Sequence, residues 1–171
     1  MDTGVQVRTS VTFAAFAKRP GDGAMITIIQ QRAEWDPEKK GPQSFAGAWQ
    51  PAAHGRTENI NEALRREISE ELGDSFAQQV EQACVISLEG QTAPEERVFH
   101  FIALMPYQAL SDISLHEGAA KLCEITEEET QAILTLEREH RSGVDSAGPI
   151  HMFPDDKRTL LEGFKRFRTE S

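Results

Sequence analysis

The stretch Arg66–Gly73, REISEELG, places three glutamates within five residues, beside an arginine. Asn59 lies before it and can cap the start of a helix, and Glu62 three residues later can close a capping box. Gly73 fits the left-handed position that follows the end of a helix. These signals predict a helix from about Ile60 to Leu72.

The acids of this helix fall on one side. At about 100° per residue, Glu67, Glu70 and Glu71 lie within an arc of about 100°. The neighbouring arc of about 80° holds the apolar side chains of Leu64, Ile68 and Leu72. The sequence therefore predicts that the acids lie at the edge of the buried face.

Two interpretations fit this charge pattern. In one, Arg66 pairs with Glu62 and Glu70, one turn away on either side, on a solvated face. In the other, the glutamates bind a cation, which offsets a repulsion of a few tenths of a kcal/mol for each like-charged pair. Carboxylate oxygens are hard ligands, and they suit Mg²⁺ or Mn²⁺ better than Zn²⁺.

Composition limits the class of protein. The 171 residues are 39% hydrophobic and carry a net charge of -10, which predicts one globular domain over residues 1–171 and opposes binding of nucleic acid. No apolar run is long enough to span a bilayer, and Met1–Gly4 does not begin a signal peptide. We expect a cytoplasmic protein with neither a nucleic-acid nor a membrane partner.

The rest of the chain alternates strands with helices. β-branched and apolar runs predict strands at Val5–Phe16, Met25–Gln30, Ala83–Leu88, Arg97–Met105 and Lys121–Ile125. Helices are predicted from Thr126 to about His140, with Thr126 and Glu129 as a capping box, and near residues 155–168 at the C-terminus. Helices interleaved with strands favour an α/β protein with a layered sheet.

The spacing around the acidic helix resembles the signature of the Nudix hydrolase family, G-x5-E-x7-R-E-U-x-E-E-x-G-U, where U is apolar. The matching identities are Glu58, Arg66, Glu67, Glu70, Glu71 and Gly73. Two positions depart from the signature, because Ala52 replaces the first glycine and Asp74 the last apolar residue. Six fixed identities at these spacings favour the cation interpretation.

This resemblance implies a Nudix-like α/β/α sandwich, with a mixed β-sheet between helices. It also implies hydrolysis of a nucleoside diphosphate linked to another moiety, with Mg²⁺ or Mn²⁺ as cofactor. Glu67, Glu70 and Glu71 would be catalytic and hold the metal with Glu117, and Arg66 would orient the glutamates. Glu67 or an acid from a later loop would act as general base.

Candidates for contacts with the substrate lie outside the helix. Arg32, Lys40 and Arg56 are predicted to bind its phosphates, and Tyr107 is one of three aromatic residues that can stack on a base. The expected partner is a small nucleotide-type molecule, and a homodimer stays open. The alternative function is a catalytically inactive Nudix-like module that senses a nucleotide or binds a protein, for which Ala52 and Ala53 give some support.

Overall fold

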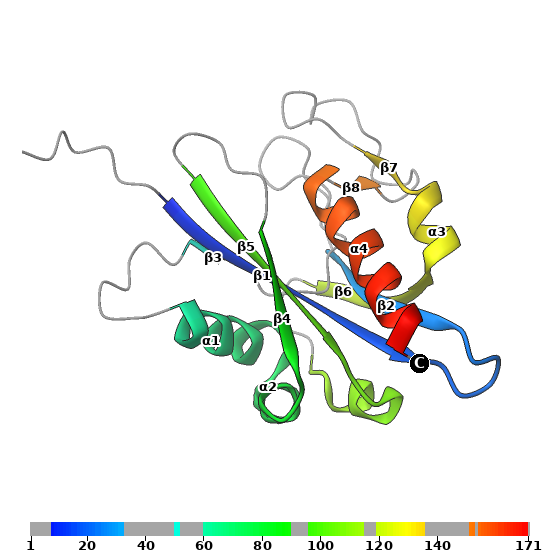
Figure 1. Ribbon diagram of the computed structural model, residues 1–171. Coiled ribbons are helices and arrows are strands. Elements are labelled where there is room, and N and C mark those ends of the chain that lie inside the picture. Colours follow the sequence, from blue (N-terminus) through cyan, green and yellow to red (C-terminus); the bar gives the residue numbers. More distant parts are fainter. Residues whose placement is uncertain are drawn as a thin grey trace, which may run out of the picture.

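A mixed β-sheet forms the centre of the protein (Figure 1). The structure is a computed structural model that describes residues 8–32, 50–51, 60–89, 96–114, 119–135, 151–152 and 154–170. In sheet order, its strands are β4 (Val85–Glu89), β5 (Glu96–Leu104), β1 (Arg8–Lys18), β2 (Met25–Arg32) and β6 (Ala119–Thr126). The short β3 (Gln50–Pro51) also pairs with β1.

The strand β1 makes the sheet mixed. It runs parallel to β5, with Arg8 opposite Glu96 and Phe16 opposite Leu104, and antiparallel to β2. The remaining neighbours, β4 with β5 and β2 with β6, are antiparallel. β1 therefore lies inside the sheet, and its side chains alternate between two covered faces.

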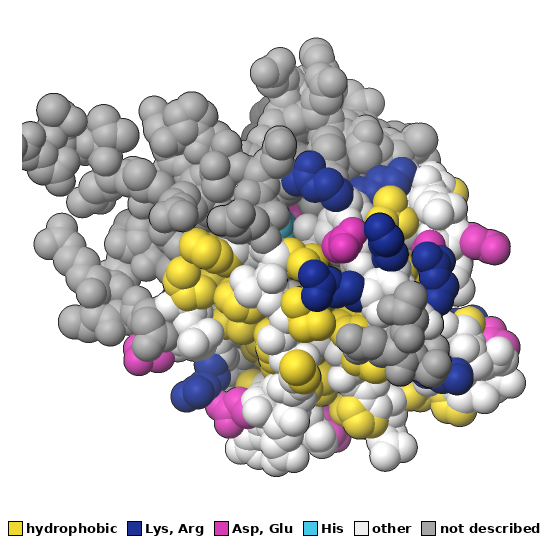
Figure 2. Space-filling model, in the orientation of Figure 1, with side chains coloured by type: hydrophobic (Ala, Val, Ile, Leu, Met, Phe, Trp, Pro, Cys, Tyr) yellow, Lys and Arg dark blue, Asp and Glu magenta, His cyan; other side chains and the backbone are white. Residues whose placement is uncertain are grey.

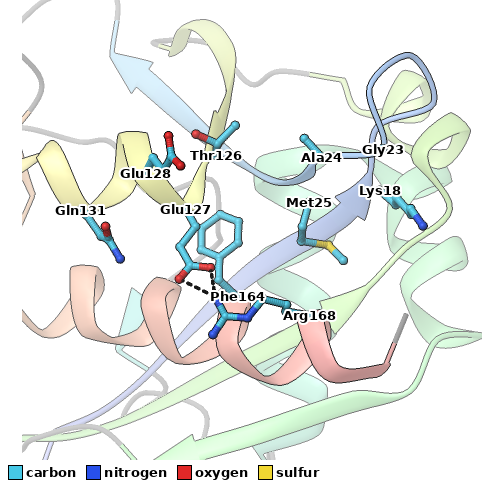
Figure 3. A pocket seen from close by; sticks show the side chains of 10 residues that line it. All are labelled: Lys18, Gly23, Ala24, Met25, Thr126, Glu127, Glu128, Gln131, Phe164 and Arg168. Atoms are coloured by element: carbon cyan, nitrogen blue, oxygen red, sulfur yellow. Dashed lines mark hydrogen bonds and ion pairs between the residues drawn. The ribbon is translucent and has the colours of Figure 1, made fainter.

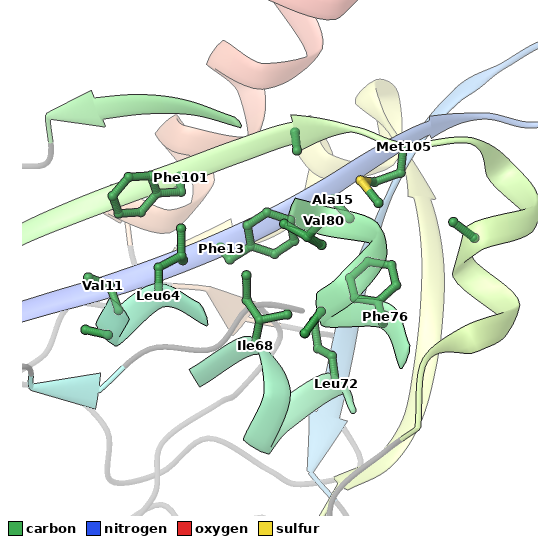
Figure 4. Packing of buried hydrophobic residues seen from close by; sticks show 14 residues of the cluster. Val11, Phe13, Ala15, Leu64, Ile68, Leu72, Phe76, Val80, Phe101 and Met105 are labelled. Atoms are coloured by element: carbon green, nitrogen blue, oxygen red, sulfur yellow. The ribbon is translucent and has the colours of Figure 1, made fainter. Parts of the chain in front are cut away.

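Helices cover both faces, as Figure 1 shows. Helices α1 (Ile60–Leu72) and α2 (Asp74–Glu81) cover one face, where their apolar side chains pack on Phe13 of β1 (Figure 4). The other face packs against α4 (Pro154–Glu170). The apolar stripe of α4 on that face consists of Leu160, Phe164 and Phe167. The predicted α/β/α sandwich with a mixed sheet is confirmed.

Close packing of α4 on the sheet depends on a glycine. The ring of Phe16 lies 5.1 Å from that of Phe164 and 5.3 Å from that of Phe167, between ring centres. A Cβ atom on Gly163 would come within 2.3 Å of Cζ of Phe16. Since Phe16 is fully buried, its ring has no room to move away. Gly163 therefore sets the distance between α4 and β1.

One predicted helix is wrong in length. α3 (Glu127–Ala132) begins with the predicted capping box, in which the Glu129 N–H donates to Thr126 Oγ1 over 3.2 Å. It does not continue to His140, because Lys157 Nζ donates to the carbonyls of Gln131 and Ile133 at its end. The chain then enters β7 (Leu134–Thr135), which pairs with β8 (His151–Met152).

Two helices were not predicted. Helix α2 starts at Asp74, directly after Gly73, and the 3₁₀ helix η2 (Tyr107–Asp112) follows β5. Asp74, the departure from the family signature, therefore belongs to the first turn of a new helix. Within the described ranges, no helix is both long and apolar enough to cross a bilayer.

Candidate functional site

Helix α1 has the predicted bounds, Ile60–Leu72, although Asn59 lies outside the described residues. Its buried side chains include Leu64, Ile68 and Leu72, which point toward β1 in Figure 4. Packing of this face on the sheet fixes the rotation of the helix about its axis. The directions of the acidic side chains follow from that rotation.

Glu67 lies inside the buried face and not at its edge. Its side chain has 0% of its surface exposed. The reason is Ala63, one turn earlier, which is also fully buried and extends the covered face beyond the arc of the leucines and isoleucine. Glu70, by contrast, keeps 50% of its side-chain surface exposed, and Glu71 is half-buried.

Arg66 connects two of the three acids. Its Nη1 donates to Glu67 Oε1 over 2.6 Å and to Glu70 Oε2 over 3.4 Å. The predicted pairing of Arg66 with Glu70 is confirmed, and the shorter contact is with the buried acid. One guanidinium therefore orients two carboxylates on successive turns.

The second oxygen of Glu67 is unsatisfied. Its Oε2 is buried and has no hydrogen-bond partner among the described residues. Burial raises the pKa of Glu67 to about 7; Arg66 opposes this shift, and the negative charges of Glu70 and Glu71 add to it. Uptake of a proton or binding of a cation would therefore stabilise this carboxyl group.

The acids of α1 are candidate ligands of a metal ion. Among the described residues, no three Asp, Glu, His or Cys side chains converge closely enough to hold one. Glu67, Glu70 and Glu71 nonetheless interact electrostatically, and they supply only hard oxygen donors, one of them buried and unsatisfied. In donor chemistry, though not yet in convergence, the three carboxylates suit Mg²⁺ or Mn²⁺.

Most of the predicted substrate contacts lie outside the described residues. Arg32 is the last residue of β2, and only its backbone is described. Lys40, Arg56 and Glu117 fall in ranges that the structure does not describe. Tyr107 lies in η2, where its hydroxyl donates to Glu124 Oε2 over 2.7 Å.

The far end of α1 carries contacts that the sequence did not predict. Ser69 Oγ donates to Asp74 Oδ1, which joins the last turn of α1 to the first turn of α2. The Ser114 N–H donates to the Leu72 carbonyl over 2.9 Å. A polar residue at the start of a helix was the available signal for Asp74, but nothing local identifies Ser114 as a partner.

Two cavities lie apart from these acids. One of about 630 Å³ lies between the β1–β2 turn, α3 and α4, where Arg168 pairs with Glu127 over 2.7 Å (Figure 3). The other, of about 450 Å³, lies between α1, α2 and the strands β4 and β5.

Hydrophobic side chains gather on the face seen in Figure 2, and basic side chains gather over α4.

Comparison with known proteins identifies the fold. No family model and no curated protein matches the chain. The Nudix domain of Shewanella oneidensis NrtR, solved with ADP ribose, is similar over 96% of this chain and 88% of its own, at 16% identity and a TM-score of 0.52. A C. elegans Ap4A hydrolase binary complex is similar over 96% of this chain and 100% of its own, at 15% identity and a TM-score of 0.55.

A third solved structure gives the same result. The Nudix hydrolase RenU from M. smegmatis is similar over 96% of this chain and 88% of its own, at 17% identity and a TM-score of 0.52. Identities this low are evidence about the fold alone. The resemblance that the stretch Arg66–Gly73 indicates is confirmed at that level: the chain has the Nudix fold.

Proposed function

We propose that this chain is a metal-dependent hydrolase that uses water to cleave the pyrophosphate bond of a nucleoside diphosphate linked to another moiety. One observation carries the proposal. Glu67 is fully buried, one of its oxygens has no hydrogen-bond partner in the described part of the chain, and it stands at a glutamate position of the Nudix signature. The Nudix fold of the chain supports the same assignment.

Energetics argue against a purely structural role for Glu67. A buried carboxylate with an unpaired oxygen destabilises the fold, typically by about 1–3 kcal/mol or more. Ala63, Leu64 and Ile68 show that apolar side chains suit this face of the helix. A chain that needed only the fold would gain stability from an apolar residue at position 67 as well.

The roles of the residues follow from their surroundings. Glu67, Glu70 and Glu71, together with Glu117, would hold Mg²⁺ or Mn²⁺. A divalent metal held there would supply positive charge for the phosphate oxygens and would activate the attacking water. Arg66 orients Glu67 and Glu70 through the hydrogen bonds that it donates to both.

Glu67 also suits the role of general base. A carboxylate whose pKa is about 7 both accepts and releases a proton readily at neutral pH. A later acid, Glu117, remains the alternative base. For Glu67 the role of base is an alternative to direct metal coordination, because a coordinated cation would lower the pKa of its carboxyl group.

Chain connectivity supports the inclusion of Glu117. Ser114 is bonded to the Leu72 carbonyl, directly after Glu70 and Glu71, and Glu117 follows only three residues later. Three residues span at most about 10 Å. This short connection is the reason for including Glu117 in the proposed donor set.

Phosphate contacts are assigned to Arg32, Lys40 and Arg56, because cations near a pyrophosphate offset its charge. The similar structures include an ADP-ribose complex and an Ap4A hydrolase, so both of these compounds belong among the first substrates to test.

The cytoplasmic location and the homodimer stay predictions.

The test is turnover of ADP-ribose, dinucleoside polyphosphates, nucleotide sugars, nucleoside triphosphates and NADH. Each is incubated with Mg²⁺ or Mn²⁺ and, separately, with a chelator. We expect cleavage of one class only with metal, and a loss of at least about 100-fold in Glu71→Gln. Glu62→Gln, an exposed acid of the same helix, is the matched control and should retain activity. Binding of a nucleotide without cleavage would favour the sensing module instead.

A further inference from the structure

The last turn of α1 is held from outside the helix. Leu72 ends α1 and directly follows Glu70 and Glu71. The last carbonyls of a helix lack partners within it. The Leu72 carbonyl instead accepts a hydrogen bond of 2.9 Å from the Ser114 N–H, in the segment that follows η2. A distant part of the chain therefore fixes the end of the acidic helix.

Gly73 makes this contact possible. Its backbone has φ 95° and ψ 153°, which residues other than glycine rarely adopt, so the left-handed helical conformation predicted for Gly73 is wrong. A Cβ atom at this position would lie 3.0 Å from Ser114 Cβ and 3.4 Å from the Ser114 nitrogen. The two backbones can approach closely only because this atom is missing.

A second contact fixes the same segment. Gln79 of α2 donates from Nε2 to Asp112 Oδ2 over 2.9 Å, and Asp112 is the last residue of η2. Between Asp112 and Ser114, Ile113 packs on the cluster that contains Leu72. The segment Asp112–Ser114, which we call the η2 clamp, thus contacts both α1 and α2.

We propose that the η2 clamp positions Glu70 and Glu71 for metal binding, without itself contacting metal or substrate. Glu70 has half of its side chain exposed, so little packing fixes its direction. Arg66 contacts the Glu70 carboxylate over 3.4 Å, and the backbone of the last turn sets where both glutamate side chains leave the helix. A set of metal ligands has to be held within roughly 0.5 Å of its working geometry. This inference rests on the proposed function.

Ser114 offers a matched pair of variants. Ser114→Pro removes the N–H that bonds the Leu72 carbonyl. The preceding residue, Ile113, has φ -69° and ψ 128°, which suits a residue before proline. Ser114→Ala keeps the N–H and removes only an exposed hydroxyl. The pair therefore isolates the backbone hydrogen bond.

The probe is Mn²⁺ alone, with its Kd measured by calorimetry, followed by kcat and KM on the substrate found in the panel. Ser114→Pro should weaken Mn²⁺ binding and lower kcat by about 10- to 100-fold, as loss of an outer contact to a metal site does. KM should change little. Ser114→Ala should have the Mn²⁺ affinity and kcat of the wild type. Both variants should unfold in urea with only a small shift of the midpoint.

Gln79→Ala is the second variant, and it keeps the test valid if Ser114→Pro fails to fold. Gln79 is exposed, so its truncation should leave the fold intact while weakening Mn²⁺ binding several-fold. Wild-type Mn²⁺ affinity and kcat in Ser114→Pro and Gln79→Ala would overturn the clamp alone. A wild-type protein that neither binds Mn²⁺ nor cleaves any substrate would overturn the proposed function, and the clamp with it.

Discussion

Among the described residues, each face of the sheet buries one titratable side chain, and the two side chains differ in their hydrogen bonding. On the α4 face, His100 is 2% exposed and its Nδ1 shares a hydrogen bond of 2.6 Å with Thr12 Oγ1. On the α1 face, Glu67 is equally buried, yet its Oε2 has no hydrogen-bond partner among the described residues. Burial alone therefore does not distinguish a structural residue from a functional one.

The difference lies in the charge of the favoured form. Burial lowers the pKa of His100, so at neutral pH its imidazole is uncharged and suits the interior. Burial raises the pKa of Glu67 to about 7, so near neutrality both forms of this carboxyl group are populated. The interior favours the neutral form and destabilises the charged one. The buried histidine has a hydrogen-bond partner, whereas one oxygen of the buried glutamate has none in the described part of the chain.

The largest expected effect is that of Glu67→Gln, which should lower kcat at least about 100-fold and yet stabilise the metal-free protein. Between pH 4.5 and 7 the folded wild type binds more protons at Glu67 than the unfolded chain, so its stability falls as the pH rises. The gain from Glu67→Gln should be on the order of 1 kcal/mol at pH 8 and should vanish at pH 4.5. Urea unfolding in chelator measures it.

Glu62→Gln, an exposed acid on the same helix, is the control for that experiment and should shift the unfolding midpoint little at either pH. Destabilisation by Glu67→Gln at pH 8 would show that the buried carboxylate is already satisfied in the metal-free protein. The contrast between the two faces would then fail.

Gly163→Ala should have the next largest effect, and it should be confined to the α4 face. The added Cβ would lie within 2.3 Å of Phe16 Cζ, and overpacking of this kind typically costs about 1–3 kcal/mol. Mn²⁺ binding by the folded fraction should not change, because α1 lies on the other face. The free energy of unfolding from urea denaturation is the readout.

The matched control is Gly21→Ala, because a Cβ atom on Gly21 would meet nothing within 4 Å. Its stability should stay within about 0.5 kcal/mol of the wild type. If Gly163→Ala also weakened Mn²⁺ binding, the two faces would be coupled through the sheet and not independent.

Local signals decided how much could be predicted. The bounds of α1 followed from periodicity and from Gly73, and the sandwich followed from the order of the elements and the resemblance. The end of α3 could not be predicted, since Lys157 and β8 arrive from far along the chain. The full burial of Glu67 also depends on tertiary packing, which no helical projection contains.

Pairs that form across the sheet were equally out of reach. Thr12 and His100 meet because β1 and β5 run parallel in one register, and the sequence gives no sign of that register. Ser114 meets Leu72 for a similar reason. Sequence analysis therefore located the acids of the candidate site, but not the contacts that hold the acids in place.

The smallest expected effect concerns pH on the α4 face. Because the pKa of His100 is lowered on folding, the unfolded chain binds more protons below pH 6.5, and stability is lost as the pH falls through that value. Burial is the main cause of the lowered pKa; the negative charge of Asp156 opposes the shift, and the positive charge of Arg158 increases it. Just below pH 6.5 the His100 contribution therefore has the opposite sign to that of Glu67.

The two slopes partly cancel in the wild type, and single variants should separate them. On acidification from pH 6.5 to 5, metal-free Glu67→Gln should lose more stability than the wild type, and His100→Gln should lose less. Urea unfolding at the two pH values measures both differences. Slopes that matched the wild type in both variants would mean that neither buried group changes its proton affinity on folding, and the contrast between the faces would lose its electrostatic basis.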